Sequence, residues 1–285
     1  MTGTADTGAA TVATGTAATG TGATEILRLE NINVVHKART GGLFRPDRVH
    51  AVNDVSLSVH RGETIGVVGE SGCGKSTLAR VMVGLQKPTS GSVFFRGTNI
   101  DRRSASTARA YGKAVSVIFQ DPATALNPRM SVHDVLIDPL NVHGIGSKAA
   151  RESRVAELLA LVGLPPSAAE VLPSQISGGQ RQRVAIARSL ALEPDVIIAD
   201  EPTSALDVSV RAQILNLLTD LKVQLGLGMV FISHDIQTVR YVSDRILVMY
   251  FGRVVEDGTA RQVFEHPADP YTRTLLGAAP GLLTR

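Results

Sequence analysis

A glycine-rich stretch at positions 69–77, GESGCGKST, has the residue types that bind a phosphate chain. It matches the pattern G-x-x-x-x-G-K-[ST], in which glycines let the backbone approach phosphates while amides and a helix start attract their charge. Lys75 is expected to reach the β- and γ-phosphates of a nucleotide, and Ser76 to offer its hydroxyl to Mg²⁺. The predicted nucleotide-binding residues of this loop are Gly69, Glu70, Ser71, Gly72, Cys73, Gly74, Lys75, Ser76 and Thr77.

Cys73, inside this loop, allows two interpretations. It is either a small filler residue or a thiol whose pKa is lowered by the helix N-terminus that follows. In the second case, alkylation of Cys73 is expected to block nucleotide access.

Two adjacent carboxylates, Asp200 and Glu201, follow the apolar run VIIA. Side chains alternate between the two faces of a strand, so the two carboxylates can serve separate tasks. Asp200 is expected to hold the Mg²⁺ shell, and Glu201 to orient or deprotonate an attacking water. Pro202 is expected to end the strand and to keep Glu201 extended.

A second candidate anion site lies in SQISGGQRQRVAIA, residues 174–187. Ser177 and Gln180 have the spacing of a capping box, so one interpretation is a capped helix and nothing more. The alternative is that Gly178 and Gly179 leave amides free to bind an anion at the helix start. No second lysine or set of metal ligands lies nearby, so that anion would be a phosphate held elsewhere.

Composition limits the remaining function classes. A net charge of +3 over 285 residues gives no reason to expect a nucleic acid partner. The single cysteine excludes an internal disulfide and a four-thiolate zinc site. The apolar runs are far too short to span a bilayer, so if the chain works at a membrane, something else is expected to hold it there.

These groups require a scaffold of alternating strands and helices. Residues 1–24 are almost entirely Thr, Ala and Gly and are predicted to form a disordered tail. Short Val/Ile-rich runs then alternate with helical patterns, which predicts an α/β fold with a mainly parallel core sheet. The strands expected within 26–60 suggest an added antiparallel sheet. Residues 129–175 have no strand pattern and are expected to form a helical subdomain, with Ser147 capping one helix.

The motifs occur in the order typical of ATP-binding cassette (ABC) ATPases, and the chain resembles that family. GESGCGKS resembles its Walker A loop, VIIADE its Walker B strand and ISGGQ its signature. SALD at 204–207 resembles the D-loop, and the Q-loop and switch positions fall on Gln120 and His234. The resemblance implies the P-loop NTPase fold, with an ABC ATPase domain over 25–265.

The family resemblance also implies roles for these residues. Two ATPase subunits would form a head-to-tail dimer, each ATP lying between one Walker A loop and the other subunit's signature. Gln120 would sense Mg²⁺ or the water, His234 would hold the γ-phosphate, and His36 is the best placement for an adenine contact. The implied sets are catalytic Glu201, His234, Gln120 and Lys75; metal-binding Ser76, Gln120 and Asp200; and, against the partner's ATP, Ser177, Gly178, Gly179 and Gln180.

Three further stretches narrow the resemblance. DPATALNPRM (121–130), HPADPYTRTLL (266–276) and GLFRP (42–46) resemble the ATPase subunits of bacterial dipeptide, oligopeptide and nickel importers. Residues 266–285 would form an importer-type extension, of the type without a C-terminal cysteine cluster. Such a subunit would work on the cytoplasmic face of the membrane with two permeases, a second ATPase and an extracellular binding protein. Import of nickel or another small solute, a non-transport ABC ATPase and a module that merely binds ATP remain alternatives.

Overall fold

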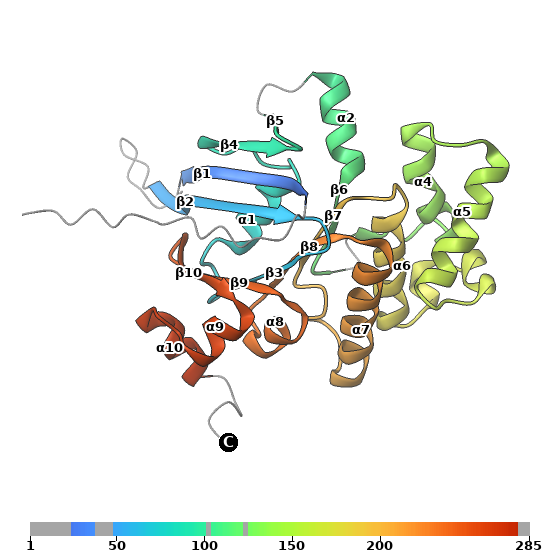
Figure 1. Ribbon diagram of the computed structural model, residues 1–285. Helices are drawn as coiled ribbons and strands as arrows, with labels where there is room; N and C mark the ends of the chain where they lie inside the picture. The colour runs from blue at the N-terminus through green and yellow to red at the C-terminus, as the bar shows by residue number, and fades with distance from the viewer. Residues whose placement is uncertain (1–23, 38–47, 101–103, 122–124, 279–285) are drawn as a thin grey trace, which may run out of the picture.

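The computed structural model describes residues 24–37, 48–100, 104–121 and 125–278. The predicted α/β fold is confirmed: a six-stranded core sheet has the order β10-β9-β3-β8-β7-β6 (Figure 1). Its strands β9, β3, β8, β7 and β6 run parallel, and β10 is antiparallel to β9. The strands are β3 (Thr64–Val68), β6 (Val115–Ile118), β7 (Val196–Asp200), β8 (Gly228–Ser233), β9 (Arg245–Tyr250) and β10 (Arg253–Thr259).

The expected antiparallel sheet is also present, in the order β2-β1-β4-β5. It lies above the core sheet in Figure 1, and α1 (Lys75–Met82) packs in the same hydrophobic cluster as the facing sides of both sheets. Alternate side chains of β8 show this layering, since Val230 and Ile232 face the antiparallel sheet while Met229 and Phe231 face the helices beyond. The strands are β1 (Glu25–Lys37), β2 (Arg48–His60), β4 (Ser90–Phe95) and β5 (Thr98–Asn99).

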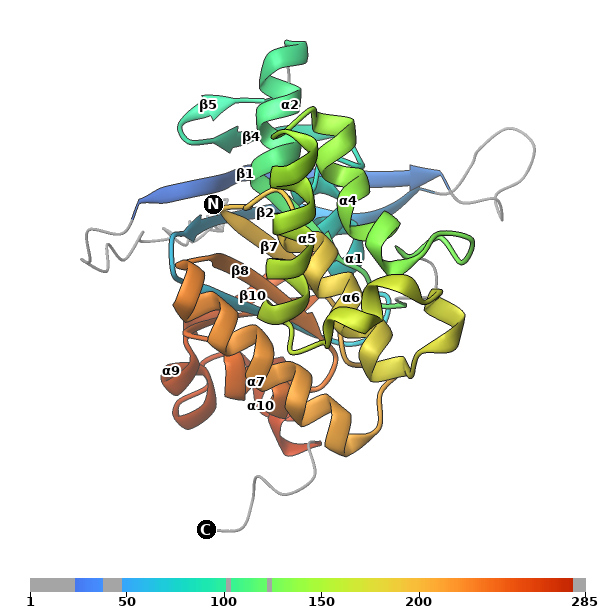
Figure 2. The same ribbon diagram turned by 90° about the vertical axis from the view of Figure 1, so that its right-hand side faces the viewer.

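Helices form the side of the molecule that faces the viewer in Figure 2. The helix predicted after Ser147 begins there, and the Ser147 hydroxyl accepts a hydrogen bond from the Ala150 amide at 3.3 Å. The limits of the helical subdomain, 129–175, stay a prediction. The elements on this side are α4 (Val132–His143), α5 (Lys148–Leu161), α6 (Gly178–Leu190) and α7 (Val208–Leu225), with short 3₁₀ turns at Pro166–Glu170 and Pro173–Gln175.

The remaining helices are α2 (Ala105–Ala114), α8 (Ile236–Val242), α9 (Ala260–Glu265) and α10 (Pro270–Gly277). None of the helices within the described ranges is long and apolar enough to cross a membrane. The predicted disordered tail, apart from Thr24, and the GLFRP stretch lie outside the described residues, as do 122–124 of the stretch after Gln120.

Candidate active site

The phosphate loop connects the carboxyl end of β3 to the start of α1, the context expected for its motif. Gly72 and Gly74 adopt φ angles of 81° and 108°, which disfavour other residues. A Cβ at Gly74 would lie 2.0 Å from the Ala51 carbonyl oxygen, and one at Gly69 would lie 2.1 Å from that of Met249. Glycines are therefore required both by backbone conformation and by close packing against β2 and β9. Residues 69–77 thus form one continuous loop and first helical turn.

Lys75 lies inside this loop and is only 5% exposed. Its ammonium donates to the carbonyl oxygens of Gly69 at 2.7 Å and Glu70 at 2.8 Å. These carbonyls hold the positive charge at the loop, where phosphate oxygens can compete for it.

Two oxygen ligands suited to Mg²⁺ meet beside the loop. The Ser76 hydroxyl donates to Asp200 Oδ1 at 3.2 Å, although 124 positions separate the two residues. Burial raises the pKa of the Asp200 carboxyl, the Ser76 hydrogen bond lowers it, and the nearby Glu201 charge raises it further. A cation would relieve this buried charge. Within the described part of the chain, no group of three or more His, Cys, Asp or Glu side chains could hold a metal ion.

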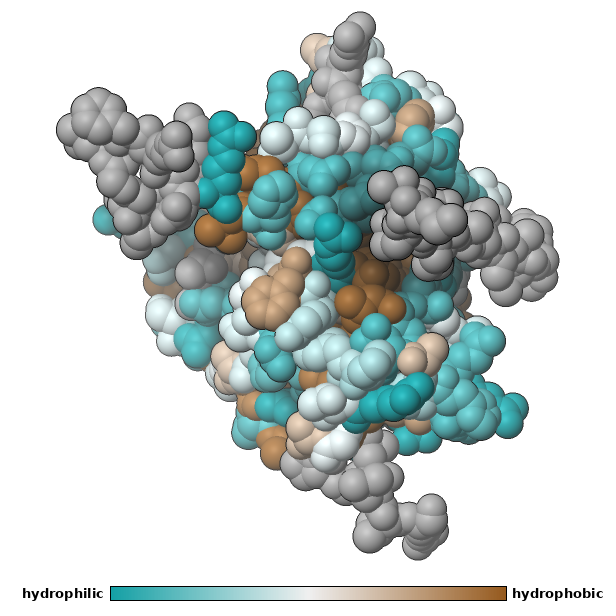
Figure 3. Space-filling view, turned by 90° about the vertical axis from the view of Figure 1, so that its left-hand side faces the viewer, coloured by the Kyte–Doolittle hydropathy of each residue, from teal (hydrophilic) through white to brown (hydrophobic). Residues whose placement is uncertain are grey.

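The three side chains predicted to act on water and γ-phosphate meet at the carboxyl ends of neighbouring strands. Gln120 follows β6, Glu201 follows β7 and His234 follows β8. Glu201 Oε2 lies 3.3 Å from Gln120 Nε2 and 3.1 Å from His234 Nδ1. A carboxylate is thus held between an amide donor and an imidazole, at the sheet edge that also carries the phosphate loop. β3 runs toward the left of Figure 1, so its carboxyl end lies on the left-hand side of the molecule. Figure 3 views the molecule from that side and shows a mainly hydrophilic surface with apolar residues near its middle.

The prediction that Pro202 keeps Glu201 extended is wrong. Glu201 has a φ of 49°, in the left-handed region. Tertiary hydrogen bonds override the local preference: its amide donates to the Ile232 carbonyl at 2.9 Å, and its own carbonyl accepts from the amide and hydroxyl of Ser204. Such strain persists where the surroundings over-determine the conformation.

The second anion site begins α6. Ser177 and Gln180 form the predicted capping box, with Gln180 Oε1 2.9 Å from the Ser177 amide and Ser177 Oγ 3.2 Å from the Gln180 amide. Gly178 lines a small cavity of about 110 Å³ together with Gln120, Pro202 and other residues of these loops. The start of α6 therefore lies beside Gln120 of the same chain.

A comparison with protein families gives the decisive observation. The family model described as "ABC transporter" matches residues 52–204, which include the phosphate loop, Gln120, the signature and Glu201. The chain belongs to the ABC transporter family. It is an ATP-binding subunit with the family's ATP-hydrolysing activity.

Curated relatives support the same placement of this ABC protein. The "Dipeptide transport ATP-binding protein DppF" of Haemophilus influenzae is 44% identical over 259 residues, which cover 91% of this chain and 79% of that protein. The "Oligopeptide transport ATP-binding protein OppF" of Bacillus subtilis is 49% identical over 234 residues, covering 81% and 77% respectively. The resemblance seen in the sequence is therefore confirmed.

Solved ABC structures show the same fold. A dimeric, post-hydrolysis structure of the ATP-binding cassette MJ0796 bound to ADP and Pi has a TM-score of 0.72 and 31% identity, covering 83% of this chain and 99% of that one. CbiO1 from Clostridium perfringens, described as part of the complex cbiONQ, also has a TM-score of 0.72, with 30% identity over 85% of this chain and 91% of that one.

Two further residues of the predicted site are Cys73 and His36. Of the two interpretations of Cys73, the structure fits the small filler residue and not the thiol of lowered pKa: Cys73 is 6% exposed, and burial raises the pKa of its thiol despite the Lys75 charge. His36 lies exposed near the end of β1, paired with Val49 of β2, and its adenine contact stays a prediction.

Sequence reasoning missed two residues near the site. Gln182 on α6 is 1% exposed and lines the same small cavity as Gln120 and Gly178. Tyr271 of α10 contacts the phosphate loop, with its hydroxyl 3.1 Å from the Glu70 amide nitrogen. The only signal in the sequence was the HPADPYTRTLL stretch, whose resemblance to importers indicated no contact.

Proposed function

We propose that this ABC ATPase hydrolyses ATP with Mg²⁺ to power the import of dipeptides or oligopeptides into a bacterial cell. The observation that carries the proposal is the Glu201 carboxylate, held between Gln120 and His234 beside the phosphate loop. The names of the curated relatives, at 44–49% identity, support peptides as the cargo.

Each residue contributes a separate part of the reaction. Lys75, now bonded to two loop carbonyls, would bind the β- and γ-phosphate oxygens, and Ser76, Asp200 and Gln120 would hold Mg²⁺. The metal neutralises charge on the phosphate oxygens when bound. Glu201 orients the attacking water and accepts its proton, and His234 keeps the carboxylate in place and contacts the γ-phosphate. His36 is proposed to stack on adenine.

The signature is proposed to close over ATP bound to a second ATPase subunit, in a head-to-tail dimer. The two glycines of the signature have different neighbours, which supports this arrangement. A Cβ at Gly179 would lie 2.6 Å from Val210 Cγ1, so packing inside the chain requires that glycine. A Cβ at Gly178 would meet only Leu206 Cδ2, at 3.9 Å. Packing within this chain therefore does not demand Gly178, whereas close approach of a phosphate to its amide would.

Alanine substitutions separate these two roles. Gly178→Ala should leave the thermal unfolding midpoint unchanged or slightly raised, since alanine favours helix, and should lower ATPase activity by about tenfold or more. Gly179→Ala is the matched comparison and should lower the unfolding midpoint. In the proposed dimer, each ATP site combines the phosphate loop of one subunit with the signature of the other. A mixed dimer of one Gly178→Ala and one Lys75→Ala subunit has both substitutions in the same site, so its other site should stay intact and active. Full activity of the pure Gly178→Ala protein would contradict the closed dimer.

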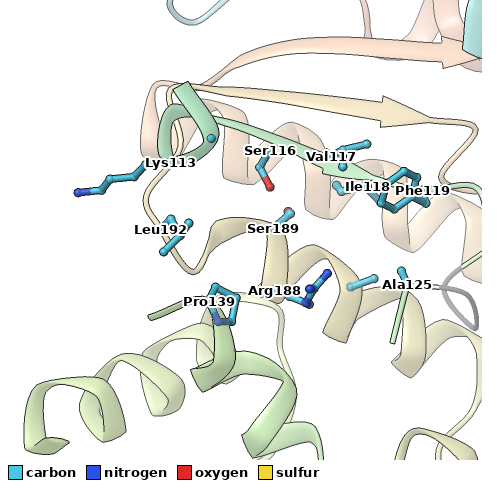
Figure 4. Close-up of a pocket in the computed structure, with 12 residues that line it drawn as sticks. Lys113, Ser116, Val117, Ile118, Phe119, Ala125, Pro139, Arg188, Ser189 and Leu192 are labelled. Atoms are coloured by element: carbon cyan, nitrogen blue, oxygen red, sulfur yellow. The ribbon is translucent and has the colours of Figure 1, made fainter. Parts of the chain in front are cut away.

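A groove between β6 and α6 is the proposed docking place for a permease segment. Ser116 and Ser189 project into it from opposite walls, with Pro139 of α4 and Arg188 nearby (Figure 4). Phe119, just before Gln120, lines the same groove and is 36% exposed. A segment seated there would touch both the helical side and the residue next to Gln120, which links transport to hydrolysis. In this assembly the chain sits on the cytoplasmic face of the membrane with two permeases, a second ATPase and an extracellular binding protein.

Co-purification from membranes tests this assembly. Tagged wild-type protein should recover two permeases, and Ser116→Trp, which fills the groove, should lose them while keeping its own ATPase activity. Val223→Trp, on an exposed position of α7, serves as the control and should recover them. A binding protein selective for nickel in the recovered system would replace peptide by metal as the cargo, and equal recovery by both variants would remove the groove from the interface.

A further inference from the structure

The C-terminal segment contacts the phosphate loop from the far end of the chain. The amide of Glu70, the second residue of the loop motif, donates a hydrogen bond to the hydroxyl oxygen of Tyr271 at 3.1 Å. The two residues are 201 positions apart, so only the tertiary fold brings them together. Tyr271 belongs to α10 and to the HPADPYTRTLL stretch, for which the proposed chemistry has no use.

Tyr271 is held in place from β10. The Glu256 carboxylate accepts hydrogen bonds from the amides of Ala268 at 2.9 Å and Asp269 at 3.0 Å. Asp269 in turn caps α10, its Oδ1 accepting from the Tyr271 amide at 2.7 Å. The segment before α10 is thus tied to the core sheet, and its first turn carries Tyr271 toward the phosphate loop.

The aromatic ring of Tyr271 is fixed by a second strand. It packs on Tyr250, the last residue of β9, with ring centroids 4.1 Å apart and an angle of 31° between the planes. Tyr250 also meets Phe251 edge-on. The adjacent Gly252 donates its amide to the Cys73 carbonyl at 2.9 Å, so the turn after β9 also contacts the phosphate loop. Tyr271 therefore packs on a turn that is itself hydrogen-bonded to the phosphate loop.

Both backbone polar groups of Glu70 are hydrogen-bonded. Its carbonyl accepts from Lys75 Nζ at 2.8 Å and from the Cys73 amide at 3.3 Å, while its amide donates to Tyr271. Phosphate oxygens would compete with that carbonyl for Lys75 Nζ. The bond to Tyr271 involves the amide and does not depend on Lys75, so it can hold the loop in both conditions. A loop already ordered before ATP arrives loses less entropy on binding.

We propose that Tyr271 is a positioning residue for the phosphate loop, and that α10 is thereby a structural part of the nucleotide site. Tyr271 does not touch the nucleotide and acts through the Glu70 amide. The inference rests on the proposed function, in which this loop binds the phosphates of ATP, and it assigns the C-terminal stretch 266–276 a role in ATP affinity.

The test compares two tyrosine-to-phenylalanine variants of the full chain. Tyr271→Phe removes the hydroxyl that accepts from Glu70 and keeps the ring on Tyr250. Tyr250→Phe is the matched control, because the Tyr250 hydroxyl makes no hydrogen bond within the described residues, and the same aromatic contact survives. Three quantities are measured for each: hydrogen exchange of the Glu70 amide without nucleotide, the Kd for ATP, and kcat at saturating MgATP.

Tyr271→Phe should exchange the Glu70 amide faster and bind ATP about three- to tenfold more weakly, the effect of one neutral hydrogen bond. Its kcat should stay within about twofold of wild type, since Glu201, Gln120 and His234 are untouched. Tyr250→Phe should match wild type in all three measurements. The thermal unfolding midpoint without nucleotide establishes that both variants are folded.

Three results would each overturn the proposal. Unchanged hydrogen exchange of the Glu70 amide in Tyr271→Phe would show that the Tyr271 hydroxyl does not protect this amide. Faster exchange with unchanged ATP affinity would show that the hydrogen bond has a structural role only. An equal loss of affinity in Tyr250→Phe would assign the effect to the aromatic cluster instead of the hydroxyl, and would also reject the proposal. Failure of wild-type protein to bind ATP would instead reject the proposed function, while the exchange measurement would still report on the contact.

Discussion

Glu201→Gln isolates the carboxylate proposed to act on water. In the wild-type protein, Glu201 Oε2 faces two neighbours, Gln120 Nε2 at 3.3 Å and His234 Nδ1 at 3.1 Å. Glutamine has the same shape, and its amide oxygen, which has two lone pairs, can still accept from both neighbours, but its other terminal atom is an NH₂ donor where glutamate has a second acceptor oxygen. It also lacks the negative charge needed to accept a proton from water.

The expected loss follows from these two changes. A positioned general base contributes about 10²- to 10⁴-fold to a rate, which corresponds to about 3 to 5 kcal/mol of transition-state stabilisation. ATP affinity should change by less than about twofold, because the proposed phosphate contacts come from loop amides and Lys75, whereas the Glu201 carboxylate bonds to Gln120 and His234. The variant should therefore bind ATP normally, hydrolyse it very slowly and accumulate as an ATP-bound dimer.

Three measurements check this prediction: phosphate release at saturating MgATP, equilibrium binding of ATP, and size-exclusion chromatography with and without ATP. Glu265→Gln is the control, since Glu265 is half-exposed on α9 and forms an ion pair with Arg261 of the same helix. That variant should match wild type throughout. Hydrolysis by Glu201→Gln within about tenfold of wild type would refute the assignment, as would a loss of ATP affinity equal to the loss of rate.

Three further predictions concern other parts of the chain. Lys75→Ala should weaken ATP binding by at least about tenfold, by titration calorimetry, because it removes charge-assisted phosphate contacts; unchanged affinity would contradict the loop assignment. Cys73, buried and with a raised pKa, should react with a maleimide about a hundredfold more slowly in the folded than in the denatured protein, as followed by mass spectrometry, and equal rates would show an accessible thiolate. A hydrogen bond to Glu152 raises the pKa of His133 in the folded state. This ion pair, which joins α4 to α5, therefore stabilises the fold fully below the unfolded-state pKa of about 6.5. The stabilisation is lost as pH rises through the folded-state pKa. Glu152→Gln should consequently lower the unfolding midpoint at pH 6 and have little effect at pH 9, whereas equal shifts at both would rule out the charged tie.

Local pattern was sufficient for most of the fold. The run GMVFIS reads as a buried strand and forms β8, in which every residue is buried. The helical spacing of apolar residues at positions 214, 217, 218, 221 and 225 predicts one buried helix face, and on α7 Ile214, Leu218 and Leu221 are buried while Leu217 and Leu225 are partly buried. Helix starts were also predictable, because a capping side chain and the amide it bonds lie within three residues of each other.

Contacts between distant segments could not be predicted in this way. A cysteine before a helix suggests a lowered pKa, yet the packing of β2 and β9 against the phosphate loop buries Cys73 and reverses the direction. The Tyr271–Glu70 bond depends on where α10 rests after β10, which no pattern near either residue encodes. Packing sets both features, and packing depends on the whole fold.

The division of labour between Asp200 and Glu201 depends on strand register. β7 pairs in parallel with β8 so that Asp200 lies opposite Ile232, and Ile232 also accepts the Glu201 amide. Asp200 is therefore the last regular strand residue and faces Ser76, whereas Glu201 turns out of the strand at a φ of 49° toward Gln120 and His234. A shift of one residue would send each carboxylate to the opposite face and separate both from their partners. The hydrogen bonds that hold Glu201 in this unfavourable conformation thus turn the two adjacent carboxylates toward different partners, Ser76 for Asp200 and the Gln120–His234 pair for Glu201, as the proposed metal and water roles require.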